Sequence, residues 1–418
     1  MSFNPFNEKP EKLDKLFIDW SSMYCKSYDK NEVDPYTKVR SILMNGTEYE
    51  AVWFLHQFHR HCADNDLRRE LALIRRQEQQ QQKLIACLKP INETVLETTI
   101  SYEQLAVDLT AILAQREPNE YVKQALDFAL LEDFDHLYRY ADLLDYEHGV
   151  HAERLVGKYT EIMPGRPTVS EHRYPFDDVR RYTDFKTAAP ITKLNVSIIT
   201  AAEQQTMNYY MNQAGFYTSD LGRRLYQDIG MIEEQHVTHY GSLMDPNVSW
   251  LECMLNHEYT ECYLYYSCWK DETDPGVKSV WERLLTMEIA HLHKAAELLK
   301  NIEKREWQEV IPNPEFPELL TFEPQKDYVR SILKNTVTNT STLEDYCDIN
   351  AIDDDAKFFM YQERIEKNVK LVPSHNIINI YIDYNGKDYR YEDKPNPVKE
   401  LQDRTKDNTD LGRTKCSK

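Results

Sequence analysis

The stretch "GMIEEQHVTHY", residues Gly230–Tyr240, decides how the fold of this chain is interpreted. It lies in a run typical of a helix and carries Glu233 and His236, one helical turn apart. Side chains at positions i and i+3 share a helix face, so these two point in the same direction. One Glu-x-x-His motif is common on solvated helices, so its meaning depends on whether the pattern recurs.

The motif does recur, and with the same surroundings. Glu288 and His291 repeat it in "MEIAHLHKAAELL", and each copy follows another glutamate, Glu203 or Glu258, by thirty residues. Two copies of glutamate, 29 other residues and Glu-x-x-His therefore lie 55 residues apart. This regular spacing is typical of an internal repeat.

A longer repeat contains both copies. Residues 46–144 and 201–299, compared at a fixed offset of 155, are identical at 21 of 99 positions. Roughly six identities would be expected by chance from ordinary compositions. The first-half counterparts of the six motif residues are Glu48, Glu78, Gln81, Glu103, Asp133 and His136. The sequence therefore predicts a tandem duplication.

Each half is expected to contain two helical hairpins. The midpoints of the four thirty-residue intervals fall in segments 62–66, 116–120, 217–222 and 270–276. These segments are rich in Asp, Asn, Gly, Pro and Ser, which favour turns and helix N-caps. If the chain reverses direction at these points, the two acidic residues of each thirty-residue interval lie side by side on the two helices of one hairpin.

The combination of donors points to a metal centre. Four carboxylates and two imidazoles can hold two divalent ions, with two glutamates bridging and one histidine on each metal. Four carboxylates also balance the charge of two divalent ions, which removes the main penalty for burying them. The predicted metal ligands are Glu203, Glu233, His236, Glu258, Glu288 and His291.

This ligand pattern resembles that of the ferritin-like di-metal carboxylate superfamily, which includes bacterioferritin, rubrerythrin and manganese catalase. The resemblance implies two iron ions, with manganese or a mixed pair as alternatives. It also implies that Glu233 and Glu288 bridge the metals and that Glu203 and Glu258 are terminal ligands. Glu261 lies one turn from Glu258 and is a rival ligand on the same helix.

Two tyrosines are candidate catalytic residues. Tyr210 and Tyr265 follow Glu203 and Glu258 by seven residues, two turns along the same face. There they would act as hydrogen-bond partners or redox-active side chains. The alternative is that they are ordinary core residues of a chain that contains 28 tyrosines.

The first half resembles a worn copy. The Gln81 amide is a poor substitute for an imidazole, and Asp133 is one methylene shorter than glutamate. A metal-free scaffold is the favoured interpretation, although Glu48, Glu78, Glu103, Asp133 and His136 could still hold one metal.

How the hairpins pair is open at this point. The C-terminal half is expected to form its own site, because only there are all six ligands present. Only 21 residues separate His236 from Glu258, however, which is short for a crossover between parallel helices. Three alternatives stay open: the hairpins stack up and down, they pair between chains, or they pair between halves with 145–200 as the crossover. In the last case the set Glu103, Asp133 and His136 would face the set Glu203, Glu233 and His236.

The expected fold is mainly α, with two tandem ferritin-like bundles at 41–145 and 196–302. The remaining parts are an N-terminal extension (1–40), an irregular connector (146–195) and a C-terminal extension (303–418). A β-hairpin at 375–392 is predicted around Asn385-Gly386, followed by a flexible tail. A lone hairpin is marginal in water, so it should dock on the bundle or on another subunit of a homo-oligomer.

Composition narrows the class of protein. The net charge of -20 argues against nucleic-acid or anionic-membrane partners, and no apolar run is long enough to span a membrane. The beginning of the chain has no apolar signal region, and the eight cysteines are scattered singly, which fits the cytoplasm.

The expected function is an oxidoreductase that reacts with dioxygen or hydrogen peroxide, as a peroxidase, ferroxidase or catalase does. An external reductant is expected, because no rubredoxin-like cysteine set is present. The alternative is a non-catalytic structural or assembly protein built on the same duplicated scaffold.

Overall fold

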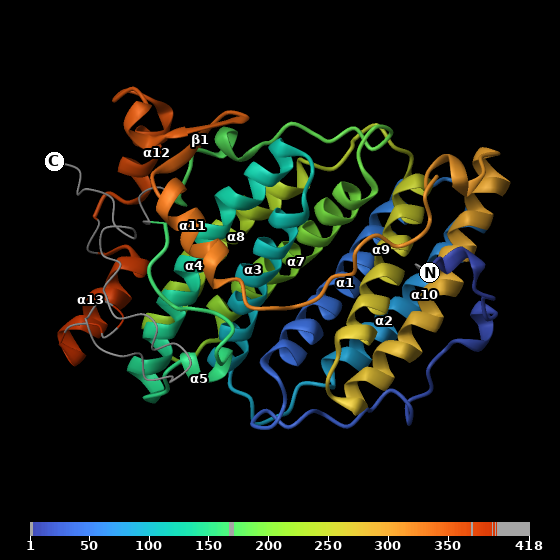
Figure 1. Cartoon of the computed structure of the whole chain (residues 1–418), viewed down its shortest axis with the longest axis horizontal. Coiled ribbons are helices and arrows are strands. Elements are labelled where there is room, and N and C mark those ends of the chain that lie inside the picture. Colours follow the sequence, from blue (N-terminus) through green and yellow to red (C-terminus); the bar gives the residue numbers. More distant parts are fainter. Residues whose placement is uncertain (1–2, 167–170, 369–370, 387, 389, 391–418) are drawn as a thin grey trace. The chain divides into compact units, whose positions relative to one another are not determined.

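A computed structural model describes residues 3–166, 171–368, 371–386, 388 and 390, and this part of the chain is mainly helical (Figure 1). Long helices dominate it: α1 (Pro35–Arg60), α2 (Asn65–Ala86), α3 (Val95–Arg116), α4 (Glu120–His148), α7 (Pro190–Phe216), α8 (Asp220–Gly241), α9 (Trp250–Asp271) and α10 (Pro275–Glu303). None of the helices within these ranges is long and apolar enough to cross a membrane.

The positions at which the long helices begin follow the internal repeat. Helices α1 and α7, α2 and α8, α3 and α9, and α4 and α10 each begin 155 residues apart. The N-caps correspond as well: α3 begins with a capping box of Thr94 and Glu97, and α9 begins with one of Ser249 and Glu252. Such a box satisfies two backbone groups at the helix start. The offset found in the sequence is therefore an offset between structural elements.

The four reversals coincide with the predicted turn segments. They separate α1 from α2, α3 from α4, α7 from α8, and α9 from α10. The second helix of each pair starts with a side-chain cap, and the capping residues are Asp64, Asn119, Ser219 and Asp274. Each accepts a hydrogen bond from a backbone N–H of the first turn that would otherwise lack a partner. The prediction that helices end and begin again at these four segments is confirmed.

The chain forms two compact units whose segments interleave along the sequence. Unit 1 comprises Met1–Glu93, Thr183–Ala202 and Asp245–Phe322. Unit 2 comprises Thr94–Tyr182, Glu203–Met244 and Glu323–Lys418. Each unit therefore combines a hairpin from the first half with a hairpin from the second half. Unit 1 contains α1, α2, α9 and α10, and unit 2 contains α3, α4, α8 and the part of α7 from Glu203 onward.

This division differs from the predicted boundaries of 41–145 and 196–302, which followed the order of the sequence. The reason lies in the link between α8 and α9. The 22 residues of α8 would extend for about 33 Å at 1.5 Å per residue. The link, 242–249, is eight residues long, and an extended chain of that length reaches at most about 29 Å. The link is too short to run back along the whole length of α8, so α9 cannot start beside the beginning of α8. The hairpin of α9 and α10 belongs to unit 1, whereas α8 belongs to unit 2.

The core of unit 1 lies between its two hairpins. Leucines such as Leu43, Leu71 and Leu284 are fully buried there. Arg40 of α1 donates from Nε to Glu272 Oε2 at 3.0 Å, at the end of α9. Because both partners are buried and paired, this ion pair fixes one arrangement of the two hairpins without leaving a charge unsatisfied.

Unit 2 has an apolar core and a buried polar network. Tyr102 of α3 stacks on Tyr209 of α7, with ring centroids 4.3 Å apart. On α4, Arg139 donates from Nη1 to Glu171 Oε2 at 2.9 Å, which attaches the irregular connector to the helix. The segment predicted as the connector, 146–195, contains α5 (Glu153–Val156) and the 3₁₀ turn η3 (Pro175–Asp178), and it includes the end of α4 and the start of α7.

The C-terminal extension contains a small β-hairpin, but not at the predicted place. Strands β1 (Asn339–Thr342) and β2 (Asp345–Asp348) pair antiparallel, with Asn339 opposite Asp348. The extension also contains η5 (Ile349–Ala351) and the helices α11 (Lys326–Thr336), α12 (Lys357–Ile365) and α13 (Pro373–Asn385). Short 3₁₀ turns elsewhere are η1 (Pro5–Asn7), η2 (Leu13–Lys15) and η4 (Trp307–Glu309).

Within the segment predicted as a hairpin, 375–392, residues 375–385 belong to α13 instead. Ile377 and Tyr381, four residues apart, are buried, and the Tyr381 hydroxyl donates to Asp145 Oδ2 of α4 at 2.7 Å. Packing of this helical face outweighs the strand preference of the isoleucines and tyrosines. Gly386 has φ 82, so it uses the left-handed freedom expected of it, but at the end of a helix. The predicted flexible tail, 391–418, lies outside the described residues.

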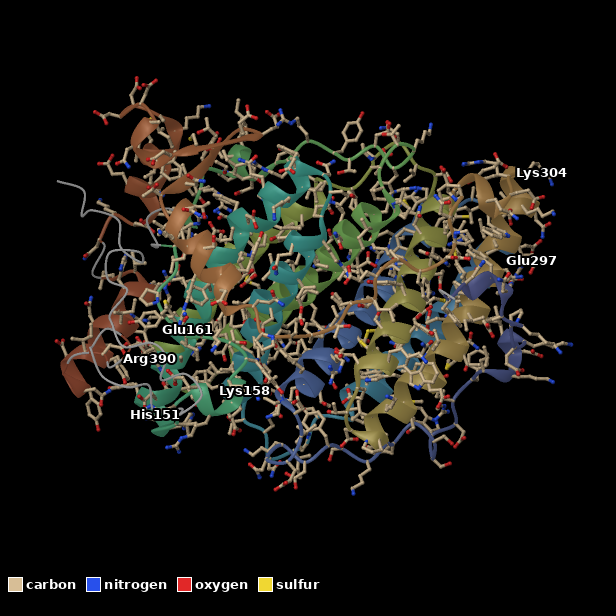
Figure 2. All side chains as sticks on the ribbon, in the orientation of Figure 1. His151, Lys158, Glu161, Glu297, Lys304 and Arg390 are labelled. Carbon is tan, nitrogen blue, oxygen red and sulfur yellow. The ribbon has the colours of Figure 1, made fainter. Side chains whose placement is uncertain are left out.

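Beyond α13, one buried arginine holds the chain against unit 2. Arg390, labelled in Figure 2, donates from Nε to Glu153 Oε1 at 2.9 Å and from Nη1 to Asp142 Oδ1 at 2.7 Å. The guanidinium is planar and always charged, so it satisfies two buried carboxylates at once.

Candidate metal centres

Unit 2 contains a cluster of six buried metal-ligand side chains, called cluster 2. They come from four helices: Glu103 on α3, Asp133 and His136 on α4, Glu203 on α7, and Glu233 and His236 on α8. None is more than 1% exposed. The two pairs separated by three residues share a helix face, which directs all six side chains into the bundle.

One glutamate lies between the two imidazoles of cluster 2. His136 Nδ1 is 3.0 Å from Glu233 Oε1, and His236 Nδ1 is 3.3 Å from Glu233 Oε2. His236 Nδ1 is also 3.2 Å from Asp133 Oδ1 and 3.7 Å from Glu203 Oε2. Two groups of donors result, each with its ligand atoms within 4.8 Å of one another: Asp133, Glu203, Glu233 and His236; and Glu103, His136 and Glu233. Glu233 belongs to both.

Several atoms of cluster 2 have no hydrogen-bond partner within the described ranges. They are both oxygens of Asp133 and of Glu203, one oxygen of Glu103 and of Glu233, Nε2 of His136 and Nδ1 of His236. Buried polar atoms nearly always have a partner, because an unpaired one costs about 1–3 kcal/mol. Metal ions bound among these atoms would supply the missing partners, so the residues fit such a ligand.

The charge state of cluster 2 follows from its burial. Burial raises the pKa of Glu103 and of Glu233 well above the ordinary value, and burial with a neighbouring carboxylate raises the pKa of Asp133 to about 7. Burial also lowers the pKa of His136 well below its ordinary value. Burial opposes the charge on His236 too, but the carboxylates beside it raise its pKa well above the ordinary value. Without metal, the cluster therefore holds protons that a cation would displace.

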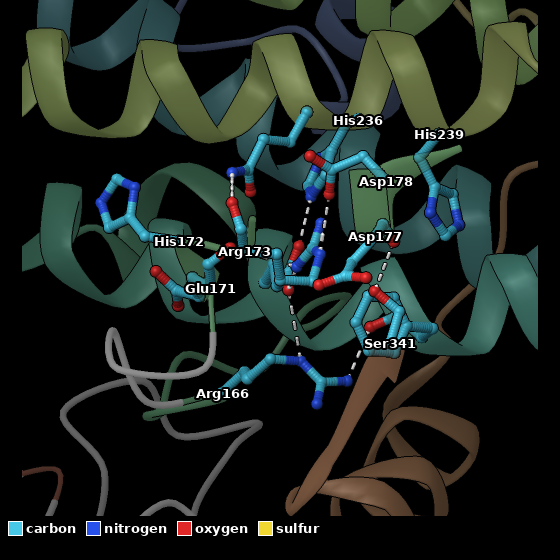
Figure 3. A network of polar contacts seen from close by, with 12 residues as sticks. Arg166, Glu171, His172, Arg173, Asp177, Asp178, His236, His239 and Ser341 are labelled. Atoms are coloured by element: carbon cyan, nitrogen blue, oxygen red, sulfur yellow. Dashed lines mark hydrogen bonds and ion pairs between the residues drawn. The ribbon is translucent and has the colours of Figure 1, made fainter. Parts of the chain in front are cut away.

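A hydrogen bond on the side of the ring that faces away from the cluster fixes the orientation of His236. Its Nε2 lies 2.7 Å from Glu132 Oε2, which leaves Nδ1 facing the cluster. Glu132 is itself ion-paired with Arg173, and Arg173 Nε donates to Asp178 Oδ1 at 2.9 Å (Figure 3). Arg166 Nε lies 3.5 Å from Glu132 Oε1. A histidine that donates its outer N–H to a carboxylate presents its other nitrogen as a metal ligand.

The two predicted tyrosines each contact a cluster carboxylate. The Tyr210 hydroxyl donates to Glu103 Oε1 at 2.5 Å, and the Tyr265 hydroxyl donates to Glu48 Oε1. Both tyrosines are fully buried. In each case the carboxylate belongs to the hairpin contributed by the other half of the sequence.

Unit 1 contains the corresponding cluster, called cluster 1. Its members are Glu48 on α1, Glu78 and Gln81 on α2, Glu258 and Glu261 on α9, and Glu288 and His291 on α10. None is more than 1% exposed. At the 155-residue offset, six members of cluster 1 correspond to the six members of cluster 2, with Gln81 at the place of His236. Glu261 has no counterpart in cluster 2.

His291 occupies the same kind of setting in cluster 1 as His236 in cluster 2. Its Nδ1 lies 2.8 Å from Glu78 Oε1 and 3.3 Å from Glu288 Oε2. Its Nε2 lies 3.0 Å from Gln77 Oε1. Gln77 precedes Glu78 as Glu132 precedes Asp133, so both units hold the outer nitrogen by a residue next to a cluster carboxylate.

The six predicted ligands are therefore divided between two clusters. Glu203, Glu233 and His236 lie in cluster 2, and Glu258, Glu288 and His291 lie in cluster 1. The prediction that the C-terminal half forms its own site was wrong, because donors from both halves meet in each cluster. Every carboxylate of the first-half copy takes part in a cluster, as the alternative of pairing between halves required.

The sequence did not predict the two residues that contact the outer nitrogens of His236 and His291. Glu132 and Gln77 lie outside the repeated motif positions, and the offset pairs them with Met287 and Ile232. A charged residue inside the run "ALLEDFDHLY" was the only available signal for Glu132. Glu261, considered a rival of Glu258, lies in cluster 1 together with it.

Neither family models, nor curated proteins, nor solved structures give a match to this chain. Function is therefore inferred from the geometry of the two clusters.

Proposed function

We propose that cluster 2 holds a pair of divalent metal ions, iron or manganese, and that the protein is an oxidoreductase that acts on dioxygen or hydrogen peroxide. The observation that carries this proposal is the position of Glu233, which is shared by two groups of donors and lies close to both imidazoles. A carboxylate placed in this way can bridge two metals. Four carboxylates and two imidazoles complete a set suited to iron or manganese.

The ligand order supports membership of the ferritin-like superfamily as part of the same proposal. In that group one glutamate from each of two helices combines with Glu-x-x-His from each of two others. Unit 2 supplies Glu103 and Glu203 on α3 and α7, and the two x-x-His motifs on α4 and α8. Its one departure is Asp133 in place of a glutamate.

The chemistry expected of such a centre is electron transfer to a small oxidant, which two redox-active metals held together can supply. The surrounding residues have separate tasks. Burial of the cluster excludes bulk water, and Glu132 holds the proton on the outer nitrogen of His236. Tyr210 holds a proton at its hydroxyl oxygen, in a hydrogen bond to Glu103. Electrons would come from an external reductant, and we place the protein in the cytoplasm.

Metal analysis with an activity assay tests this proposal. The full-length chain is purified without chelators, its iron and manganese are counted, and its consumption of hydrogen peroxide and dioxygen is measured. The test variant is Glu233→Gln with His236→Gln, which keeps the side-chain volumes close to those of the wild type. It should lose two metal ions per chain and the activity. The matched control is Glu234→Ala, an exposed neighbour on α8, which should change neither.

Two results would contradict the proposal. If the double variant binds as much metal as the wild type while its melting curve shows a folded protein, cluster 2 is not the metal site. If the wild type binds metal at cluster 2 but consumes neither oxidant in the presence of a reductant, the oxidoreductase assignment fails and a structural role for the metals is favoured.

A further inference from the structure

Cluster 1 differs from cluster 2 at three positions, one of which, Glu288 in place of Asp133, keeps a carboxylate. The other two positions change the kind of donor. Gln81 stands where cluster 2 has His236, so one imidazole is absent. Glu261 stands where unit 2 has Ala106, at the same 155-residue offset, so one carboxylate is added. Glu261 follows Glu258 by three residues and shares its helix face.

The added carboxylate points into the cluster. Glu48, Glu78 and Glu261 each place a ligand atom within 4.8 Å of the others. In cluster 2 the matching group is the one that contains His236. The loss of a nitrogen donor and the gain of an oxygen donor therefore affect the same half of the cluster.

The side chain of Glu261 is fully buried, with His257 beside one of its oxygens. It is 0% exposed, and neither of its oxygens has a hydrogen-bond partner in the described part of the chain. His257 Nε2 lies 3.4 Å from Oε2. A buried carboxylate in this state is costly unless a cation completes its surroundings.

Two neighbouring oxygen atoms also lack a hydrogen-bond partner. Glu48 Oε2 and Gln81 Oε1 are also buried without a hydrogen-bond partner among the described residues. The Gln81 amide donates from Nε2 to Glu48 Oε1 at 3.1 Å, and rotation of the amide would present its oxygen instead. The donors of the group Glu48, Glu78 and Glu261 are therefore all oxygens, and His257 does not belong to this group.

The other half of cluster 1 keeps its nitrogen donor. Glu78, Glu258, Glu288 and His291 form a second group, again with ligand atoms within 4.8 Å of one another. Glu78 belongs to both groups and is the counterpart of Glu233. Cluster 1 thus repeats the bridged arrangement with two chemically different positions.

We propose that cluster 1 is a second two-metal centre in which Glu261 replaces the missing imidazole, so that one position binds its ion through oxygen alone and takes Mn²⁺. Carboxylate and carbonyl oxygens suit manganese, whereas imidazole donors favour the later metals of the series. The His291 position retains a mixed nitrogen and oxygen donor set and accepts iron or manganese. This centre is independent of the redox function proposed for cluster 2.

The test separates the two clusters by working in a chain whose cluster 2 is disabled. In the background Glu233→Gln with His236→Gln, the full-length protein is titrated with Mn²⁺, and bound metal is counted by elemental analysis after gel filtration. Two Mn²⁺ ions per chain are expected. Glu261→Ala, which copies Ala106 of unit 2, should reduce the number to one, and Glu261→Gln should do the same while keeping the volume filled.

A rescue variant controls for damage to the fold. Gln81→His combined with Glu261→Ala gives cluster 1 the donors of cluster 2, so binding should return to two ions per chain. Its oxygen-only position is gone, so Zn²⁺ should compete with Mn²⁺ more strongly than in the parent background. Binding of two ions by both Glu261 variants, or of none by the background chain, would overturn the proposal. Failure of cluster 2 would show separately, as equal metal content in the wild type and the background.

Discussion

Removing the metals should make the stability of the protein fall as the pH rises from about 5 to about 7. The reason is the burial of carboxyl groups in cluster 2, where Glu103, Asp133 and Glu233 all have raised pKa values. A group whose pKa is raised by folding stabilises the folded chain below its unfolded pKa. That stabilisation is lost as the pH rises from the unfolded pKa to the folded pKa. For Asp133 this pH window runs from 3.8 to about 7.

Two buried histidines of unit 2 act in the opposite sense. Burial lowers the pKa of His136 and of His239, so the stability that these neutral rings contribute is lost as the pH falls through their ordinary pKa of about 6.5. Other buried groups of unit 2 titrate as well, among them His375, whose burial lowers its pKa to about 4, so only the contribution of Asp133 is counted here, as one proton held by the folded chain. One proton corresponds to about 1.4 kcal/mol per pH unit, or roughly 3 kcal/mol across this range. For a unit of this size the melting temperature should fall by roughly 6–12 °C.

The assay is calorimetric melting of the full-length chain after treatment with a chelator, at about pH 5, 6 and 7. Adding Mn²⁺ should reverse the trend, because metal ligands must lose their protons to bind. Asp133→Asn is the matched control: it removes one titrating carboxyl and should flatten the metal-free trend. Equal pH trends in the metal-free wild type and in Asp133→Asn would refute the reasoning.

Three further variants test the surroundings of the clusters. Glu132→Gln weakens the acceptor behind His236, so equilibrium dialysis should show about 10- to 100-fold weaker metal binding at cluster 2; unchanged affinity would contradict a positioning role. Tyr210→Phe removes one buried hydrogen bond and should lower the unfolding free energy of the metal-free chain by roughly 1–2 kcal/mol in a urea titration, whereas an unchanged midpoint would count against that bond. Arg139→Met leaves its carboxylate partners buried and unpaired, so urea unfolding should show a loss of about 3–5 kcal/mol; a neutral effect would mean that the network relaxes.

The repeat and the helices could be predicted from the sequence because their signals are local. A Glu-x-x-His motif, a turn rich in Asp, Asn and Pro, and an N-cap such as Asp274 each act within a few residues of the chain. The recurrence of these signals at an offset of 155 predicted the four hairpins and the donors they carry. Glu261 was also visible as a possible ligand, because it shares a face with Glu258.

The segment 373–385 shows where local signals fail. Its isoleucines, its tyrosines and the Asn385-Gly386 pair all favour a β-hairpin. The helix forms because burial of Ile377 and Tyr381 against unit 2 contributes more than the local preference. A preference of less than about 1 kcal/mol per residue is easily outweighed by burial of a large apolar side chain, which contributes about 1.5–3 kcal/mol.

The sequence by itself determined which residues are donors, which helices carry them and that each donor set occurs twice. Only the tertiary structure decided which hairpins share a core, and with that, which donors meet. The six residues that match in the second half could have formed one centre, yet the eight-residue link 242–249 is too short to return along α8. The donors consequently separate into two clusters. Gln81, which looked like decay of one copy, donates to Glu48, and Glu48 belongs to the same group of donors as Glu261. Gln81 and Glu261 are 180 positions apart in the sequence, and only folding brings them to one cluster.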